Sequence, residues 1–593
     1  MAAVTTSGLS ITAKGKSKVL VNFPYDPGKV AAIKEIPGRA FDPLTKAWEV
    51  PVNVDTCLPF IDFCCAYDYE LDDDLYNRFS ALVDEARQRD QTRGLNKQQS
   101  GAYAADLEVV GLGPGITVRP FQKAGIAYIL RNLKVLLGDD MGLGKTGQSI
   151  CAVQHRSAFP CLVLCPAAVK YNWEKEWAKW VPTRAVSVLD TKTNPQPDFT
   201  RPVIVVNYDQ IDKFLPQLLE LDLQSVICDE SHMLKSKKTK RYGLVSQVVK
   251  KAVMRLLLTG TPVVNMPYDL IAQLSLLDVL QQFGGEWKFI NRYCGAERTA
   301  FGMNTKGASN LTELHERLRE ICYIRRLKTE VVKELPAKSR NLVPVELSNA
   351  KEYARAEDNV LKWLGDKAEG DGEFRRSLKG LTEAEKQKAI YDRRQAAINK
   401  GAAAEHLVRM NALLSLAGTG KIQPAIDWIT DFLASGEKLV VFAVHKDVVN
   451  AIADHFNAPR IMGETSLVQR EKNKNYFCEE PTCKLLVMNL QAGGTGIDGL
   501  QHVCNHALFV ELGWTPAVHA QAEDRLNRIG QLFGVMAHYL LGRYCIDTDL
   551  YGLLDKKGQM SDAVIDGKQI ANEESVMKEL MQGMLNRQKQ LAL

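Results

Sequence analysis

The sequence lacks several features that would place the chain in a membrane or in a secretory route. No window approaches the roughly 18 consecutive apolar residues that a membrane-spanning helix requires. The opening segment, MAAVTTSGLSITAKGKSKVL, has no apolar core of signal-peptide length. We therefore expect a protein with no export signal, no membrane partner and an intracellular location.

Cys-x-x-Cys pairs are also missing, although the chain has 13 cysteines. Cys161, Cys165 and Cys228 lie inside apolar runs, which predicts free, buried thiols in a reducing interior. One further set could supply zinc ligands, but it lacks the Cys-x-x-Cys spacing of structural zinc modules. That set is Cys478, Cys483, His502, Cys504 and His506. We favour structural thiols and keep zinc as the alternative.

Positive and negative charges nearly balance, since the net charge is only +5 over 593 residues. This balance is compatible with local basic stripes but does not demonstrate nucleic-acid binding. The acidic-lysine or histidine-rich constellation of a nuclease is missing too, as are obvious chromatin-reading modules. The length predicts roughly three to five domains.

Two stretches alternate short apolar runs with helical segments. From Arg119 to about residue 275 the runs are VLLGDD, CLVLCP, PVIVVNYD, SVICDES and RLLLTGTP. From near Gly418 they are KLVVFAVH, KLLVMNLQAGGTG and HALFVELGW, followed by an expected helix, QAEDRLNRIGQ, and a strand, GVMAHYLL. Such runs are typical of parallel strands buried on both faces, with functional loops at their carboxyl ends. The pattern predicts an α/β protein with two parallel-sheet domains.

The remaining segments differ in character. The first hundred or so residues predict a small module with a strand, a short helix, a Pro/Gly turn and a second strand that ends at Trp48. A polar stretch then leads to the break GLGPG at 111–115. Residues 276–345 predict partly basic helices, and residues 351–400, with 22 charged residues, predict exposed helices projecting from the core.

The segment LLGDDMGLGKTGQSI at 136–150 carries the strongest chemical signal. A strand runs into a Gly-containing loop, and Gly144-Lys145-Thr146 open a helix. Backbone N–H groups there can cradle a polyphosphate, while Lys145 reaches the β- and γ-phosphates and Thr146 holds magnesium. The strict pattern has Gly where this chain has Asp139. For this segment alone, a Gly-rich turn without a ligand stays an alternative.

A pair of carboxylates, Asp229-Glu230, ends the apolar run of VICDESHM. In a nucleotide hydrolase one carboxylate binds magnesium through water, and the other orients and activates the attacking water. An acidic strand end is the simpler alternative. Because the pair follows the phosphate-binding segment in the expected order, the two together predict nucleotide hydrolysis.

Two further segments complete the expected site. RLLLTGTP ends in polar groups that can link the nucleotide to a neighbouring surface, namely Thr259, Gly260, Thr261 and Pro262. QAEDRLNRIGQ contains Gln521, Arg525 and Arg528. The two arginines, three apart, would share a helix face, from which they could reach the γ-phosphate and make hydrolysis depend on domain closure. A solvated arginine pair is the alternative.

RPFQKAG, DDMGLGKT, DESH, LTGTP, NLQAGGTGIDGLQ and QAEDRLNRIGQ occur in this order over roughly residues 115–560. This set resembles the motor signature of superfamily-two helicases, and the forms DMGLGKT, DESH and RIGQ resemble its Swi/Snf branch. The resemblance implies ATP and Mg²⁺ as cofactors, with Gln122 recognising adenine beside Arg119 and Phe121. It implies Lys145, Asp229, Glu230, Arg525 and Arg528 as catalytic residues, with Arg528 as the arginine finger. Further implied nucleotide contacts are Asp140, Met141, Gly142, Leu143, Gly144, Thr146 and Gly496, and the implied metal-binding residues are Thr146 and Asp229. Asn527 departs from the family, because many relatives carry His before the finger.

Nucleic-acid contacts are expected in segments that follow strands of the first sheet domain and in elements of the second. The run Lys235, Lys237, Lys238, Lys240 and Arg241 fits phosphate binding and a solvated basic turn equally well. The family layout implies that Pro166 and Asn207-Tyr208 line a nucleic-acid groove. It gives coupling or DNA-facing roles to Thr495 with Gly496 and to Trp514 with Pro516. Because no base-reading motif is visible, we expect recognition of backbone and shape.

NFPYDPGKVAAIKEIPGRAFDPLTKAWEVP is similar to the small domain that precedes the motor in annealing helicases of the HARP type. An unrelated small domain with a Phe–Trp core is the alternative. The expected layout is a HARP-like module (1–110), a first RecA-like ATP-binding lobe (115–275), a helical linker with protrusions (276–415), a second RecA-like helicase C-terminal lobe (416–560) and a helical tail (561–593).

The resemblance implies a DNA-dependent ATPase that translocates on double-stranded or forked DNA, in the nucleoid or nucleus. The alternatives are a strand-separating DNA or RNA helicase and a non-catalytic DNA clamp.

Overall fold

The computed structural model describes residues 10–14, 17–191, 193–194, 196–260, 267–299, 302–305, 307–369, 382, 385–386, 403–493, 497–565 and 580. The chain divides into two compact units, Met1–Gln99 and Ser100–Leu593. Within the described ranges, no helix has the length and apolar character needed to cross a membrane.

The N-terminal unit is an α+β module built on a four-stranded antiparallel sheet of order β1-β2-β4-β3. Its elements are β1 (Ser10–Lys14), β2 (Lys18–Asn22), α1 (Pro27–Glu35), β3 (Ala40–Asp42), β4 (Ala47–Pro51), α2 (Cys57–Ala66) and α3 (Asp73–Ser100). Asp26 caps α1 by accepting from the Lys29 backbone N–H at 2.9 Å. Val19, Val21, Phe60 and Phe79 are fully buried, so the core lies between the sheet and the helices.

A seven-stranded parallel sheet forms the first lobe of the second unit, with strand order β13-β5-β10-β9-β6-β8-β7. Its strands are β5 (Lys134–Leu137), β6 (Cys161–Cys165), β7 (Val186–Val188), β8 (Val203–Asn207), β9 (Ser225–Asp229), β10 (Met254–Leu258) and β13 (Tyr323–Ile324). Its helices are α4 (Pro120–Asn132), α5 (Lys145–Arg156), α6 (Lys170–Trp180), α7 (Ile211–Glu220), α8 (Lys240–Val249), α9 (Leu270–Leu276), α10 (Gly285–Tyr293), α11 (Leu311–Ile321) and α12 (Lys328–Val331). A small hairpin joins β11 (Glu297–Thr299) to β12 (Gly302–Asn304).

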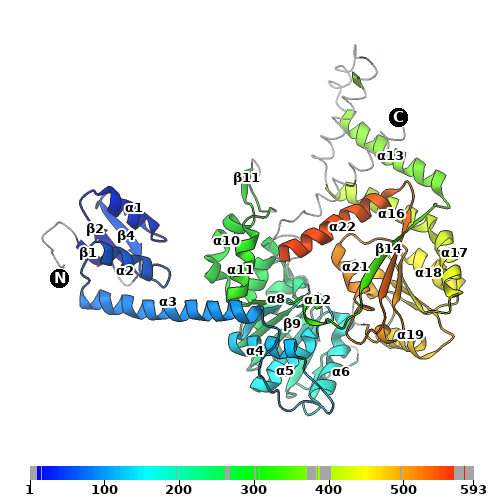
Figure 1. The fold of residues 1–593 in the computed structure, drawn as a ribbon, viewed down its shortest axis with the longest axis horizontal. Coiled ribbons are helices and arrows are strands. Elements are labelled where there is room, and N and C mark those ends of the chain that lie inside the picture. Colours follow the sequence, from blue (N-terminus) through cyan, green and yellow to red (C-terminus); the bar gives the residue numbers. More distant parts are fainter. Residues whose placement is uncertain are drawn as a thin grey trace. The chain divides into compact units, whose positions relative to one another are not determined.

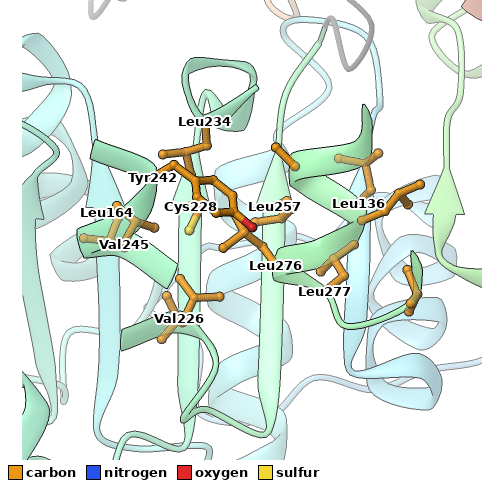
Figure 2. Close-up of a cluster of buried hydrophobic side chains, with 14 of the residues drawn as sticks. Leu136, Leu164, Val226, Cys228, Leu234, Tyr242, Val245, Leu257, Leu276 and Leu277 are labelled. Atoms are coloured by element: carbon orange, nitrogen blue, oxygen red, sulfur yellow. The ribbon is translucent and has the colours of Figure 1, made fainter. Parts of the chain in front are cut away.

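Alternation of side chains along each strand buries both faces of this sheet. On β9, Val226 and Cys228 point into one core with α7, α8 and α9, whereas Ile227 points into the other with α4, α5 and α6. Figure 2 shows the first of these cores, where Tyr242 and Val245 of α8 lie against the strand residues. Burial on both faces explains why these strands appear in the sequence as continuous apolar runs.

The second lobe is a six-stranded parallel sheet of order β14-β19-β18-β15-β17-β16. Its strands are β14 (Lys338–Val345), β15 (Leu439–Ala443), β16 (Arg460–Ile461), β17 (Leu485–Asn489), β18 (His506–Phe509) and β19 (Val535–Gly542). Its helices are α13 (Ala350–Glu369), α16 (Ala403–Gly420), α17 (Ile422–Leu433), α18 (Lys446–His455), α19 (Leu467–Glu479), α20 (Leu490–Gly493), α21 (Pro516–Glu523) and α22 (Ile546–Ile565). Helices α17 and α18 cover one face, and α16, α19, α21 and α22 cover the other. Figure 1 shows β14 with the surrounding helices α17, α18, α19 and α21.

The structure departs from the sequence expectations in the segment 276–345, which is not wholly helical. Its last strand, β14, pairs with β19 over eight residues and belongs to the second lobe, well before Gly418. β14 does not have the continuous apolar run of the other strands because it lies at the sheet edge, where most of its residues are exposed and Pro344 is tolerated. Of the expected tail at 561–593, residues 566–579 and 581–593 lie outside the described residues.

Phe41 and Trp48 of the N-terminal unit do not form a buried core pair. Their rings are in contact, with centroids 5.1 Å apart, but Phe41 is 48% exposed and Trp48 is only partly buried. The core of this unit is formed instead by aliphatic strand residues and the phenylalanines of α2 and α3.

Candidate active site

Three neighbouring strands of the first lobe bring the expected nucleotide-binding segments together. β10 lies between β5 and β9, with Leu258 level with both Leu137 and Asp229. The phosphate-binding segment follows β5, Thr259 follows β10, and the carboxylate pair ends β9. Because parallel strands all end at the same sheet edge, segments more than a hundred residues apart in sequence meet there.

The phosphate-binding loop, residues 138–144, depends on glycine at two positions. Gly142 and Gly144 have φ angles of 81° and 75°, a left-handed conformation that L side chains rarely adopt. A Cβ on Gly144 would lie 2.5 Å from the Gln122 amide nitrogen. That amide donates to the Leu143 carbonyl at 3.2 Å, and the Gln122 Oε1 accepts from the Arg119 backbone N–H at 3.0 Å. The structure therefore places the expected adenine-recognising glutamine directly against the phosphate loop.

Asp139, the departure from the strict phosphate-loop pattern, is a fully buried ion-pair partner of Arg326. The Arg326 backbone N–H and its Nε both donate to Asp139 Oδ1 at 3.0 Å, and its Nη2 pairs with Oδ2. Gln148 of α5 donates to Asp139 Oδ2 at 3.0 Å and accepts from Arg326 at 2.8 Å. A third contact joins Arg326 to the Phe121 carbonyl. The aspartate thus ties the loop to the segment after β13, a structural role that glycine could not fill.

Asp229 and Glu230 lie at the carboxyl end of β9 with different surroundings. The Asp229 carboxylate accepts from its neighbour's backbone N–H at 3.0 Å and from the Trp173 indole Nε1 at 2.9 Å. Burial, reinforced by the charge of Glu230, raises the pKa of Asp229. Burial also acts upward on Glu230, but His232, Lys145 and Arg525 together hold the pKa of Glu230 below its ordinary value. Glu230 therefore stays ionised, as a residue that orients an attacking water requires.

Lys145 begins α5 and turns its ammonium into the loop, where it donates to the Asp139 carbonyl at 2.7 Å and to the Asp140 carbonyl at 3.3 Å. Burial lowers the pKa of Lys145, and the charges of Glu230, Asp139, Asp140 and Asp229 oppose that shift. Lys145 is therefore surrounded by four carboxylates at the centre of the site.

The strand end after β10 is linked to the carboxylate pair through His232. The His232 Nδ1 lies 3.2 Å from both the Glu230 carboxylate and the Thr259 hydroxyl. Gly260 offers its carbonyl to Arg325 at 3.3 Å. Thr261 and Pro262 lie outside the described residues.

Arg525 and Arg528 do not share a helix face, because α21 ends at Glu523. The chain leaves the helix through tight turns in which Leu526 donates to Glu523 at 3.0 Å and Gln531 donates to Arg528 at 3.0 Å. Both arginines nevertheless contact the same carboxylate, Asp498.

The arginine segment faces the nucleotide-binding lobe. Burial lowers the pKa of Arg525, while the charges of Asp498 and Glu230 raise it, which places Arg525 within electrostatic reach of Glu230. A Cβ on Gly142 of the phosphate loop would lie 3.3 Å from the Arg528 side chain. Both expected catalytic arginines therefore stand beside the phosphate-binding elements.

Lys328 joins the two lobes at this point. Its backbone N–H donates to Asp140 Oδ2 at 2.9 Å. Its ammonium pairs with Asp524 at 2.8 Å and donates to the Asn527 carbonyl at 2.8 Å. Asn527 thus makes its contact to the first lobe through its backbone, and its side-chain amide donates to the Pro336 carbonyl at 3.4 Å.

The basic run after β9 is largely neutralised by carboxylates. Lys237 pairs with Glu286 at 2.8 Å, Lys240 with Asp212 at 3.1 Å and Arg241 with Asp209 at 2.7 Å. Lys238 is exposed, and Lys235 is partly buried. These pairs leave less positive charge for a nucleic acid than the sequence run suggests.

The other expected nucleic-acid residues have three different settings. Pro166 follows β6, and Asn207 ends β8 as the register partner of Cys165, so the two segments are neighbours at the carboxyl edge. Trp514 is half-buried and donates to the Asn411 side chain at 3.0 Å, and Pro516 begins α21. Thr495 and Gly496 lie outside the described residues.

Two cysteines of the alternative zinc set, Cys483 and Cys504, contact backbone carbonyls through their thiols. Cys504 contacts the carbonyls of Lys438 at 3.2 Å and His506 at 3.3 Å, and burial raises the pKa of Cys504 to about 12. In the part of the chain that the structure describes, no group of three or more His, Cys, Asp or Glu side chains is arranged to hold a metal ion.

Sequence reasoning missed several residues of this site. The most important are Trp173, Asp498, Arg325, Arg326 and Lys328. The run RRLK at 325–328 was a usable signal, because consecutive cations that follow an apolar strand need buried or bound partners.

Comparison with known proteins agrees with this layout. Residues 97–389 match the SNF2-related domain, and residues 423–530 match the helicase conserved C-terminal domain. The chain is 32% identical over 470 residues to the DNA annealing helicase and endonuclease ZRANB3 of Homo sapiens, covering 76% of this chain and 40% of that protein. The chain spans about two fifths of the length of this relative.

Two relatives carry the name SWI/SNF-related matrix-associated actin-dependent regulator of chromatin subfamily A-like protein 1. The Xenopus tropicalis protein is 32% identical over 462 residues, covering 76% of this chain and 45% of that protein. The Caenorhabditis elegans homolog is 28% identical over 559 residues, covering 91% of this chain and 74% of that protein.

The Sulfolobus solfataricus SWI2/SNF2 ATPase core in complex with dsDNA is a similar solved structure. The match has 23% identity and a TM-score of 0.36, and it covers 81% of this chain and 98% of that chain. Because an SNF2-related domain and a helicase conserved C-terminal domain follow one another on a single polypeptide, the chain belongs to the SNF2 family of helicase-like proteins.

Proposed function

We propose that this chain is an ATPase that moves along double-stranded DNA. One observation carries the proposal, namely that a phosphate loop, an ionised Glu230 and two arginines from the other lobe stand together. Arg525 is within electrostatic reach of Glu230, and Arg528 lies against Gly142 of the loop. An arginine supplied across a lobe boundary makes hydrolysis depend on closure, which converts turnover into motion.

The residues present fit ATP and Mg²⁺. Thr146 and Asp229 offer a hydroxyl and a carboxylate, the hard oxygen ligands that Mg²⁺ prefers. When bound, Mg²⁺ would neutralise charge on the phosphates. Lys145 would bind the β- and γ-phosphates, Gln122 would recognise adenine, and Glu230 would orient the attacking water.

Arg528 has to change partners if it acts as the arginine finger. Its guanidinium pairs with Asp498 of its own lobe, so contact with a phosphate means exchanging one anion for another. Lys328 keeps the turn at 524–527 against the phosphate loop while this exchange takes place. We propose that this exchange accompanies lobe closure.

For the nucleic acid we propose a backbone-reading surface along the carboxyl edge of the first lobe. It includes the segments at Pro166 and Asn207, together with Lys235, Lys237 and Lys238, with Trp514 and Thr495 contributed by the second lobe. Because three neighbouring cations are already paired with carboxylates, we expect few direct phosphate contacts from the basic run. Work on genomic DNA also implies an intracellular location at the nucleoid or nucleus.

The test is ATP turnover by the purified chain with blunt duplex, forked duplex, single-stranded DNA and RNA. Duplex DNA should stimulate turnover most, and Lys145→Ala should abolish it with every nucleic acid. Stimulation by RNA or single-stranded DNA alone would favour a strand-separating helicase. Turnover in the Lys145→Ala variant equal to that of the unaltered chain would favour a non-catalytic clamp.

We further propose that the chain rewinds melted or forked DNA. Relatives named DNA annealing helicases support this. The match to the C. elegans homolog leaves only 9% of this chain uncovered and so includes part of the N-terminal unit. The endonuclease part of the ZRANB3 name is not extended to this chain, because the match leaves 60% of that protein uncovered.

Removal of residues 1–99 tests the annealing role. The truncation should begin at Ser100, whose hydroxyl accepts from Arg319 of the second unit at 2.8 Å. Annealing of melted duplex should be lost while DNA-stimulated hydrolysis is largely kept. Equal annealing by the full and truncated chains would reject the role of the N-terminal unit.

A further inference from the structure

Asp229 is held by two aromatic side chains that the expected chemistry does not use. Trp173 donates its indole N–H to the Asp229 carboxylate at 2.9 Å, and the Tyr208 hydroxyl donates to the Asp229 backbone carbonyl at 2.6 Å. Trp173 is 1% exposed and Tyr208 is 2% exposed. One bond fixes the carboxylate and the other fixes the strand end that carries it.

The two aromatics lie close in sequence to the loops that we propose to face the nucleic acid. Trp173 lies near the start of α6, seven residues after Pro166, which follows β6. Tyr208 follows Asn207 at the end of β8, and its backbone N–H donates to the Cys165 carbonyl at 3.1 Å. Both loops are therefore joined to each other and to Asp229.

Tyr208 also connects this network to the surface. The Arg241 guanidinium lies 6.0 Å from the Tyr208 ring centroid and pairs with Asp209 at 2.7 Å. The Asp209 side chain is 62% exposed, so a phosphate approaching this pair can compete for Arg241. A change of partner at Arg241 would then be transmitted to Asp229 through Tyr208.

Simple core packing does not account for Trp173, because its neighbour Trp177 provides a direct comparison. Trp177 is on the same helix, is fully buried, and its indole N–H has no hydrogen-bond partner among the described residues. Burial in this core therefore does not require a bonded indole. The hydrogen bond from the Trp173 indole to Asp229 is therefore not a general consequence of burial in this core.

We propose that Trp173 and Tyr208 are positioning residues through which duplex DNA bound at the β6 and β8 loops sets the orientation of the Asp229 carboxylate and so stimulates hydrolysis. This rests on the proposed function and names the route by which nucleic acid regulates it. Neither side chain touches the nucleotide, and both act through Asp229.

Four full-length variants test the proposal: Trp173→Phe, Tyr208→Phe, the double variant and the control Trp177→Phe. The first two remove one hydrogen-bonding group while leaving an aromatic ring, and thermal unfolding confirms that each variant is folded. The readouts are kcat and KM for ATP with and without duplex DNA, DNA affinity, and binding of a fluorescent non-hydrolysable ATP analogue with saturating Mg²⁺ or with EDTA.

Trp173→Phe should lower DNA-stimulated kcat about ten-fold, since a hydrogen bond to a charged group is lost. It should also reduce the gain in analogue affinity that Mg²⁺ provides, while analogue affinity in EDTA and DNA affinity change little. Tyr208→Phe should lower the ratio of DNA-stimulated to basal kcat several-fold. The double variant should be less impaired than the product of the single effects, because both bonds position one residue, Asp229. Trp177→Phe should match the unaltered chain in all of these readouts.

Two results would overturn the proposal. One is a Trp173→Phe protein with unchanged Mg²⁺-dependent binding and unchanged stimulation, and the other is an equal loss in Trp177→Phe. If duplex DNA fails to stimulate the unaltered chain, the proposed function fails, and the coupling to DNA fails with it. The Mg²⁺-dependent binding of the Trp173→Phe variant then still decides whether Trp173 positions Asp229.

Discussion

Replacing Arg326 with methionine should destabilise the first lobe strongly. Arg326 and Asp139 are fully buried, and the substitution leaves the Asp139 carboxylate with only the Gln148 amide and a backbone N–H as donors. Breaking a buried ion pair by removing one partner costs about 3–5 kcal/mol. For a lobe of this size the loss corresponds to a fall in Tm on the order of 10 °C.

The exposed pair Arg201–Asp198 supplies a matched control. Its atoms are 2.8 Å apart, but its side chains are 50% and 45% exposed. Arg201→Met should therefore cost only about 0–1 kcal/mol. Combining Arg326→Met with Asp139→Asn should recover part of the lost stability, because no uncompensated charge stays buried.

Differential scanning calorimetry provides the measurement, and the transition of the first lobe is the one that an ATP analogue shifts upward. The physical argument depends on the buried charge rather than on lost packing. If Arg326→Met lowers the Tm of that transition no more than Arg201→Met, or if the double variant is less stable than Arg326→Met alone, the argument is wrong.

Three other outcomes are expected. The pKa of Glu523 is about 2 because the hydrogen bond from Arg340 and the charges of Lys338 and Arg340 outweigh the effect of burial, the largest single influence, which acts upward. This value lies below the ordinary glutamate pKa of about 4.3. The contribution of ionised Glu523 to the free energy of unfolding is therefore complete above that pH and is lost as the pH falls towards 2. Glu523→Gln should make the stability of the second lobe less dependent on pH in this acidic range, as measured by thermal unfolding. Arg528→Ala should lower DNA-stimulated kcat by about 10³-fold with little change in ATP-analogue affinity. A decrease in kcat of less than ten-fold would show that Arg528 is not the arginine finger. Duplex affinity measured by fluorescence anisotropy should fall between low and physiological salt, and a flat dependence would contradict backbone reading.

The order of the chemical segments could be predicted because each lies at the end of a buried parallel strand. An apolar run followed by a polar or Gly-rich turn marks both the strand and its functional end, as at Asp229 and Lys145. These local patterns were enough to predict the α/β class and two sheets.

What the sequence did not reveal depends on long-range pairing. β14 is polar and exposed because it is an edge strand, so no apolar run marks it. The Asp139–Arg326 bond joins residues 187 positions apart, and no local spacing indicates it. The end of α21 at Glu523 was missed because neither Gly nor Pro follows it at once, and the Glu523 side chain instead binds Lys338 and Arg340 of β14.

Because β14 belongs to the second lobe, the direct link between the two lobes is short. Val332 packs in a small cluster with Phe121 and Leu143 of the first lobe, and β14 begins at Lys338, so only residues 333–337 are left between them. Fully extended, such a link reaches at most about 20 Å. Each lobe is thus held at a high effective concentration near the other, and under the proposed function the length of this link would limit how far the lobes can separate in one cycle of turnover.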